Sequence, residues 1–207
     1  MAENKGLLLV VSGPSGVGKG TICRKVIATD GTVKLSVSAT TRKKRPDEIE
    51  GQDYYFKSRE EFERMVNAGE FLEHMPIFNS NLYGTLKAPV VEQLEMGNSV
   101  ILEIDYHGAL NVKKSYPEAV LVFVAPPAFA ELKNRLIRRN TESAAEIDAR
   151  LKTAMEEIDM MEKFDYIIVN DVADAAAEKL LSILKAEKCH LDRNEEFIHT
   201  LREGIQK

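Results

Sequence analysis

Short apolar runs alternate along the chain with longer segments in which apolar residues recur at helical spacing. Runs such as LLLVVS at 7–12 and AVLVFVA at 119–125 show no strict alternation of polar and apolar residues. This pattern is typical of strands that are buried on both faces of a sheet. Because such strands alternate with helices, the sequence predicts an α/β fold with a central parallel sheet. The predicted strands are 7–12, 33–38, 99–105, 119–125 and 166–171, and the predicted helices begin at Lys19 and cover 87–96, 107–115, 127–139 and 172–188.

Two segments interrupt this alternation. Residues 39–86 are polar and rich in Arg, Glu, Tyr and Asn, so they predict a small insertion with short strands of its own. Residues 136–149 are rich in arginine at first and then give a helix start, because Ser143 and Glu146 fit a capping box. The helix that follows carries one apolar stripe, which consists of Ile147, Leu151, Ala154, Ile158 and Met161.

Composition limits the class of protein. With 207 residues, 44% of them hydrophobic, the chain is long enough for one globular unit with a sizeable core. The net charge of −5 gives no overall attraction to nucleic acid, so any phosphate binding has to be local. Cys23 and Cys189 lack metal-binding or disulfide spacing, which favours a reducing compartment, the cytoplasm. The apolar run LLLVV is far shorter than the ~20 residues of a membrane span.

The stretch SGPSGVGKGT at 12–21 follows the first predicted strand and leads into a helix. A glycine-rich loop in that position directs backbone N–H groups at an anion, and a lysine adds charge for the terminal phosphates of a nucleotide. The pattern G-x-x-x-x-G-K-[ST] is met from Gly13 to Lys19 but fails at Gly20. A hydroxyl ligand of Mg²⁺ is expected there, and Thr21 is the nearest substitute. The flanking strand and helix disfavour the alternative of a glycine-rich turn with a surface lysine.

A second basic stretch, SVSATTRKKRPDEIEGQDYYF at 36–56, holds Arg42 and Arg45 together with two adjacent tyrosines. Because arginine binds phosphate bidentately and tyrosine hydroxyls add neutral donors, the simplest use is a second phosphate site. A solvated charged loop is the alternative. A nucleic-acid patch is opposed by the acidic residues between 47 and 50 and by the negative total charge.

The order and spacing of several motifs resemble those of guanylate kinases, which transfer a phosphoryl group from ATP to GMP. The motifs are SGPSGVGKGT, SVSATTRKKRP with GQDYYF, GEFLEH, YGT, LEID with HGA, APP before LKNRLIRRNTES, and YIIVND, within residues 6–187. The resemblance implies a P-loop, three-layer α/β/α fold. It also implies a core of 6–35, 87–134 and 150–187, a GMP-binding insertion at 36–86, a mobile lid at 135–149, and a helical tail at 188–207 to which it gives no function.

The resemblance also implies roles for individual residues. For ATP, with its Mg²⁺, it implies Gly13, Pro14, Ser15, Gly16, Val17, Gly18, Lys19, Gly20, Thr21 and Asn170, with Thr21 as the candidate metal ligand. For GMP it implies Ser38, Arg42, Arg45, Tyr54 and Tyr83 at the phosphate, and Glu73, Thr85 and Asp105 at the base. Guanine offers N1–H and N2–H₂ donors that one carboxylate accepts together, whereas adenine lacks this pair.

For catalysis the resemblance implies Lys19, Arg42, Arg135, Arg139 and Arg150, the last three as lid arginines that close over ATP. Glu48 and Glu103 resemble acidic positions near the GMP site and the metal. The implied substrates are ATP and GMP, with dGMP as a further acceptor, in the cytoplasm and in purine nucleotide metabolism. No nucleic-acid or membrane partner is expected, and oligomeric state is left open.

Two other functions have to be weighed against this one. Guanylate-kinase-like domains in scaffold proteins keep the fold but bind peptides, and they typically lack the phosphate loop and its lysine. A kinase for another nucleoside monophosphate would lack the carboxylate that reads guanine. The presence of Lys19 and of Glu73 therefore favours a guanylate kinase over both.

Overall fold

Two sheets organise the chain in the computed structural model, which describes residues 5–77, 81–138 and 144–205. The main sheet has the order β2-β7-β1-β8-β9, and all its strands are parallel, as the sequence predicts. The second sheet has the order β4-β3-β6-β5. The strands are β1 Leu8–Ser12, β2 Val33–Leu35, β3 Ser38–Thr40, β4 Tyr55–Phe56, β5 Phe71–Ile77, β6 Asn81–Leu86, β7 Ser99–Glu103, β8 Val120–Ala125 and β9 Tyr166–Val169.

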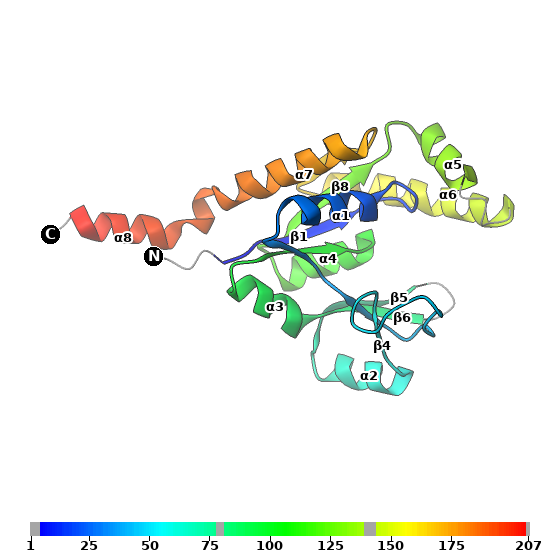
Figure 1. The fold of residues 1–207 in the computed structure, drawn as a ribbon, viewed down its shortest axis with the longest axis horizontal. Helices are drawn as coiled ribbons and strands as arrows, with labels where there is room; N and C mark the ends of the chain where they lie inside the picture. Colours follow the sequence, from blue (N-terminus) through cyan, green and yellow to red (C-terminus); the bar gives the residue numbers. More distant parts are fainter. Residues whose placement is uncertain (1–4, 78–80, 139–143, 206–207) are drawn as a thin grey trace.

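Helices cover both faces of the main sheet (Figure 1). On one face α1 and α7 pack together, and their side chains Ile22, Val26 and Leu180 join a core under β1 and β8. On the other face α3 and α4 cover β1 and β7. The three layers that the family resemblance implies are therefore present. The helices are α1 Lys19–Thr29, α2 Arg59–Asn67, α3 Lys87–Glu95, α4 Tyr106–Ser115, α5 Phe129–Arg138, α6 Ala144–Asp159, α7 Ala173–Lys188 and α8 Glu195–Ile205, with short 3-10 turns at Met161–Lys163 and Leu191–Arg193.

The predicted single strand at 33–38 is wrong, because the chain changes sheets within it. β2 ends at Leu35, and the Ser36 N–H makes a further bond of 2.9 Å to the main sheet, donated to the carbonyl of Ile101. β3 then begins at Ser38 in the second sheet. Polar residues at alternate positions of this run suit strands with one solvent-facing side rather than a strand buried on both faces, and this alternation is the signal that was missed.

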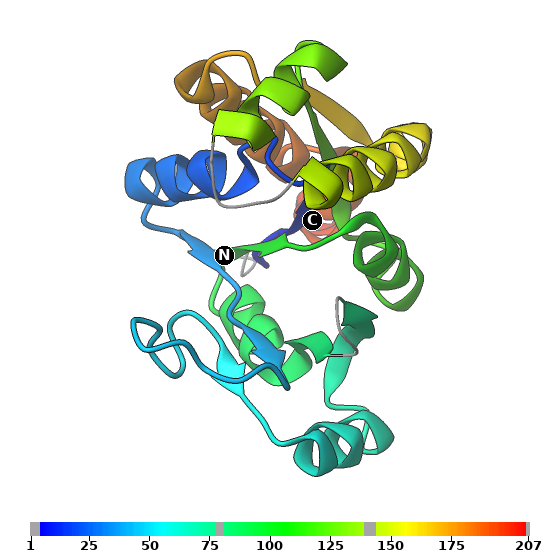
Figure 2. The same ribbon diagram turned by 90° about the vertical axis from the view of Figure 1, so that its right-hand side faces the viewer.

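The insertion contains a helix that the expectation of short strands leaves out. Ser58 caps α2, and its hydroxyl accepts a 3.1 Å hydrogen bond from the backbone N–H of Glu61. The spacing S-x-x-E at 58–61 is a capping box and marks this helix start in the sequence. Phe62 and Met65 bury the inner side of α2 against the second sheet. Figure 2 shows α2 and this sheet below the main layers.

The apolar stripe predicted after Ser143 is shorter in the structure. Leu151 and Ala154 are buried on α6, but the helix ends at Asp159, so Met161 lies beyond it and is partly exposed. Ser143 lies outside the described residues.

The tail is helical, as predicted, and α8 extends the chain away from the main sheet (Figure 1). Among the described residues, no helix combines the length and apolarity needed to cross a membrane.

Candidate active site

The glycine-rich loop joins the carboxyl end of β1 to the start of α1, the edge at which open parallel sheets bind ligands. Gly13 has φ of 138°, and a Cβ there would lie 2.2 Å from the carbonyl oxygen of Val124. Gly18 has φ of 100°, and a Cβ there would lie 2.6 Å from Asn170 Nδ2. Both positions therefore require glycine, because the loop is curved and packed closely against β8 and β9.

Lys19 lies along the inside of this loop. Its Nζ donates to the carbonyl of Gly13 at 2.5 Å and to that of Pro14 at 3.4 Å. Burial lowers the pKa of Lys19, and the nearby carboxylates of Glu157 and Glu103 oppose that decrease. The ammonium is thus held among negative groups, with its charge directed at the loop.

Side chains from α5 and from the residue that follows β9 hold the loop from outside. Asn170 Nδ2 donates 2.7 Å to the carbonyl of Val17, and Arg135 donates to the carbonyls of Val17 and Asn170 at 3.3 and 3.1 Å. Arg135 also pairs with Glu131 at 3.1 Å. Among the described buried side chains, Asn170 Oδ1 is one of the few polar atoms without a hydrogen-bond partner. Arg139, the other predicted lid arginine of this segment, lies outside the described residues.

Helix α6 contacts the same loop at Ser15. Arg150 Nη1 donates a 2.7 Å hydrogen bond to Ser15 Oγ. Glu157 is buried on the same helix, and its carboxylate lies near the ammonium of Lys19. The side chain of Ser15 is therefore engaged by a helix far along the chain, an arrangement that no local motif indicated.

The start of α1 contains Thr21, the residue predicted to bind Mg²⁺. Thr21 is exposed, and its hydroxyl accepts from Arg24 Nη2 at 3.5 Å. At Gly20, a Cβ would lie 3.2 Å from Glu103 Oε2. The carboxylate of Glu103 thus occupies the space beside Gly20, where the strict pattern has a hydroxyl side chain.

A second group of predicted residues meets where β5 and β6 face the start of α4. Thr85 Oγ1 donates 2.8 Å to Glu73 Oε1, and these residues are paired in register. Burial raises the pKa of Glu73 to about 7, and the charge of Asp105 adds to the increase. Asp105 caps α4 by accepting the N–H of Gly108 at 2.8 Å. A Cβ on Gly108 would lie 3.1 Å from Glu73 Oε2, so glycine leaves room for this carboxylate.

The basic stretch forms a separate cluster in the same insertion. Arg42 makes a bidentate contact with Glu48, at 2.5 and 3.0 Å, which holds the pKa of Glu48 below its usual range. The Arg42 guanidinium lies 5.3 Å from the ring centroid of Tyr54. The rings of Tyr54 and Tyr83 are 5.9 Å apart, edge to face. The alternative of a solvated charged loop does not describe Arg42, which is only 18% exposed.

Two other predicted phosphate ligands flank this cluster. The backbone N–H of Arg45 donates to Glu48 at 2.8 Å, and its side chain is exposed. Ser38 is half-buried and stands opposite Thr85 in the second sheet. The sequence therefore located the parts of this cluster, but it did not identify Glu48 as the partner of Arg42.

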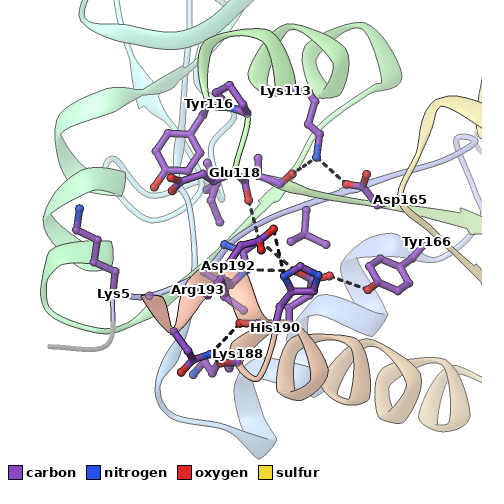
Figure 3. Close-up of a pocket in the computed structure, with 18 of the residues that line it drawn as sticks. Lys5, Lys113, Tyr116, Glu118, Asp165, Tyr166, Lys188, His190, Asp192 and Arg193 are labelled. Carbon is purple, nitrogen blue, oxygen red and sulfur yellow. Dashed lines mark hydrogen bonds and ion pairs between the residues drawn. The ribbon is translucent and has the colours of Figure 1, made fainter. Parts of the chain in front are cut away.

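A cavity of about 910 Å³ lies elsewhere, at the amino ends of β1 and β8 (Figure 3). Its charged side chains face one another. Lys113 pairs with Asp165 at 2.9 Å, Arg193 pairs with Glu187 at 3.1 Å, and Tyr166 donates to Glu187 at 2.6 Å. These charged groups are paired with one another, and they lie at the edge of the main sheet opposite the glycine-rich loop. The cavity is therefore the junction between the C-terminal tail and the main sheet.

The chain matches known proteins over almost its whole length. The family model described as guanylate kinase matches residues 5–187. A guanylate kinase of Caldanaerobacter subterraneus subsp. tengcongensis is 48% identical over 201 residues, 97% of each chain. One of Clostridioides difficile is 49% identical over 198 residues, 96% of each chain. Among solved structures, the crystal structure of guanylate kinase from Anaplasma phagocytophilum has a TM-score of 0.75 and 35% identity, and the match covers 92% of this chain and 90% of that one.

Proposed function

The chain belongs to the guanylate kinase family and transfers a phosphoryl group from ATP to GMP, and we propose that its site residues form a donor side and an acceptor side. The donor side is the loop between β1 and α1, and the acceptor side is the second sheet. Neither the family match nor the relatives support the alternative of an inactive interaction module.

On the donor side, the backbone N–H groups of residues 13–21 and the ammonium of Lys19 neutralise the phosphates of ATP. The contact between Lys19 and the loop carbonyls supports this role, because it keeps the ammonium inside the loop. The unpartnered Oδ1 of Asn170 supports a role near adenine, whose amino group is a donor. Arg135 and Arg150 have to exchange their present loop partners for phosphate oxygens to stabilise the transferring group. For Arg139 the lid role remains a prediction.

On the acceptor side, the carboxylate of Glu73 accepts the N1–H and N2–H₂ donors of guanine, with Thr85 and Asp105 beside it. The observation that carries this assignment is a buried carboxylate that, among the described side chains, has a hydroxyl partner and no ion pair. Adenine would leave that carboxylate unpaired, which is costly in a buried site. Arg42, with Arg45, Ser38, Tyr54 and Tyr83 around it, binds the GMP phosphate.

Mg²⁺ is the divalent metal that we assign to this site, bound together with ATP. It is usually held by one or two carboxylates, by substrate phosphates and by water. Glu103, beside Gly20, fits that donor set, whereas the hydroxyl of Thr21 is turned toward Arg24. Bound there, the metal would neutralise charge on the phosphates of ATP.

The free thiols Cys23 and Cys189 also fit the reducing cytoplasm that we predict.

The assignment of the base-reading carboxylate is tested by a coupled turnover assay with ATP, Mg²⁺ and each of GMP, AMP, UMP and CMP. We expect turnover with GMP to exceed that with AMP by about 10³-fold or more, because AMP leaves Glu73 unpaired. Comparable turnover with AMP would contradict the assignment of Glu73.

Replacing Arg42 with lysine should raise the KM for GMP by about tenfold, with a smaller change in the KM for ATP. Lysine keeps the charge but loses the bidentate contact with Glu48 and the contact with the Tyr54 ring. Arg64→Lys, an exposed arginine on α2, is the matched control and should leave both constants unchanged. If the KM for GMP is the same in Arg42→Lys and in the wild type, the phosphate site lies elsewhere.

A further inference from the structure

Glu131 lies in the first turn of α5, and neither the sequence motifs nor the catalytic assignments give it a role. Its Oε1 accepts a 3.1 Å hydrogen bond from Nε of Arg135, one helical turn further along. The Arg135 side chain is 23% exposed and that of Glu131 is 33% exposed, so the pair is partly sheltered from solvent. Shelter strengthens an ion pair, so this contact firmly holds one edge of an arginine that belongs to the donor side.

Helix α5 is packed directly against the phosphate-binding loop. Leu132 and Leu136, which follow Glu131 and Arg135 in the chain, are both buried. A Cβ on Gly16 would lie only 2.9 Å from Leu136 Cδ2, so the helix and the loop approach closely there. Glu131 and Arg135 therefore project from a helix whose position relative to the loop is set by packing.

The three nitrogens of the Arg135 guanidinium have different partners. Nε donates to the carboxylate of Glu131, whereas Nη1 and Nη2 donate to the backbone carbonyls of Val17 and Asn170 at 3.3 and 3.1 Å. Hydrogen bonds from arginine to an anion are shorter, about 2.7–2.9 Å, and stronger than those to neutral carbonyls. Phosphate oxygens of ATP therefore compete well for Nη1 and Nη2.

The structure also allows this exchange without leaving the loop unpaired at Val17. The carbonyl of Val17 accepts a second hydrogen bond, of 2.7 Å, from Asn170 Nδ2, and this bond does not depend on Arg135. The contact at Nε is different, because Glu131 is itself an anion that phosphate repels and cannot replace. Since the guanidinium is planar, a fixed Nε limits the directions in which the other two nitrogens can point.

We propose that Glu131 is a positioning residue for phosphoryl transfer, which holds Arg135 by Nε while Nη1 and Nη2 move from the two carbonyls to the transferring phosphate. This inference rests on the donor-side role proposed for Arg135. Glu131 acts through Arg135 and not on ATP directly. Its loss should therefore lower kcat and leave the KM for GMP unchanged, because the second sheet is not involved.

The test is a double-mutant cycle in the full chain, with kcat measured at saturating ATP and GMP. We expect Arg135→Ala to reduce kcat about 10²-fold and Glu131→Ala to reduce it about tenfold. In the Arg135→Ala background, Glu131→Ala should change kcat by less than about twofold, because the side chain that it positions is gone. Glu131→Gln keeps an oxygen acceptor for Nε and should recover most of the loss.

Glu63→Ala on α2 is the matched control. Glu63 pairs with Arg59 Nε at the same distance of 3.1 Å and the same four-residue spacing, and both side chains are exposed. Its removal costs a helix a similar ion pair, so it should leave kcat and both KM values unchanged. Thermal unfolding of every variant measures the loss of stability separately from the loss of turnover.

Three outcomes would overturn the proposal. Losses that multiply in the double variant would show that Glu131 acts independently of Arg135, as a part of the helix only. A Glu131→Ala variant with wild-type kcat would show that Arg135 is positioned without it. A glutamine variant as impaired as the alanine variant would assign the effect to charge rather than to the hydrogen bond. Wild-type protein inactive with GMP would instead contradict the function itself, so the two failures are distinguishable.

Discussion

Replacing Lys19 with methionine should reduce kcat for phosphoryl transfer from ATP to GMP by about 10³-fold. Methionine has a similar length, so the loop keeps its packing while the ammonium is lost. Nothing else in the described loop carries a full positive charge, and the carbonyls of Gly13 and Pro14 would lose their donor. The KM for GMP should change little, because the second sheet is untouched. A coupled assay at saturating GMP measures the loss.

Lys25→Met on the same helix is the matched control. Lys25 is partly exposed and pairs with Asp174, away from the loop, so its removal should leave kcat within about twofold of the wild type. Thermal unfolding of both variants separates a loss of chemistry from a loss of structure. If Lys19→Met keeps more than about a tenth of the wild-type kcat, the assignment of Lys19 to the transferring phosphates is wrong.

Local patterns predicted the phosphate loop well, because its determinants are consecutive in the chain. A buried strand, a run of glycines and a lysine at the helix start are all within residues 7–19. The helix of the insertion was missed although its signal, Ser58 followed by Glu61, was just as local. The break in the strand at 33–38 was likewise visible as an alternation of polar residues. These misses are errors of interpretation rather than of missing information.

The supports of the loop could not be predicted from local patterns, because they come from distant parts of the chain. Asn170 reaches the carbonyl of Val17 across 153 residues, and Arg150 reaches Ser15 across 135. Glu157 belongs to no motif, and in the sequence it is one more acidic residue on an amphipathic helix. Only the packing of α6 against the core reveals that its carboxylate is buried.

Replacing Glu73 with glutamine should lower kcat/KM for GMP by about 10²-fold and should also change how it depends on pH. Glutamine presents one oxygen and one N–H₂ group, so it accepts one guanine donor and opposes the other. In the wild type, burial raises the pKa of Glu73 to about 7, and guanine binds the ionised form. Wild-type kcat/KM should therefore fall as the pH drops below about 7. The phosphate of GMP, whose second pKa is about 6, titrates with both proteins. The pH profile of the Glu73→Gln variant therefore gives the contribution of the phosphate alone, and the difference between the two profiles gives that of Glu73.

The same substitution should make the nucleotide-free protein more stable at high pH. The pKa of Glu73 is higher in the folded chain, about 7, than its usual 4.5, so the folded state holds the proton more tightly. The stability contributed by this group is therefore fully present below pH 4.5 and is lost as the pH rises through about 7, where the buried carboxyl is half ionised. Glu73→Gln removes that loss, and its free energy of unfolding at pH 8 should exceed that of the wild type by about 2–3 kcal/mol. Glu70→Gln, an exposed neighbour, should change neither stability nor kcat/KM. A glutamine variant that is less stable at pH 8, or that keeps the wild-type pH profile, would show that Glu73 is not the titrating carboxylate that reads guanine.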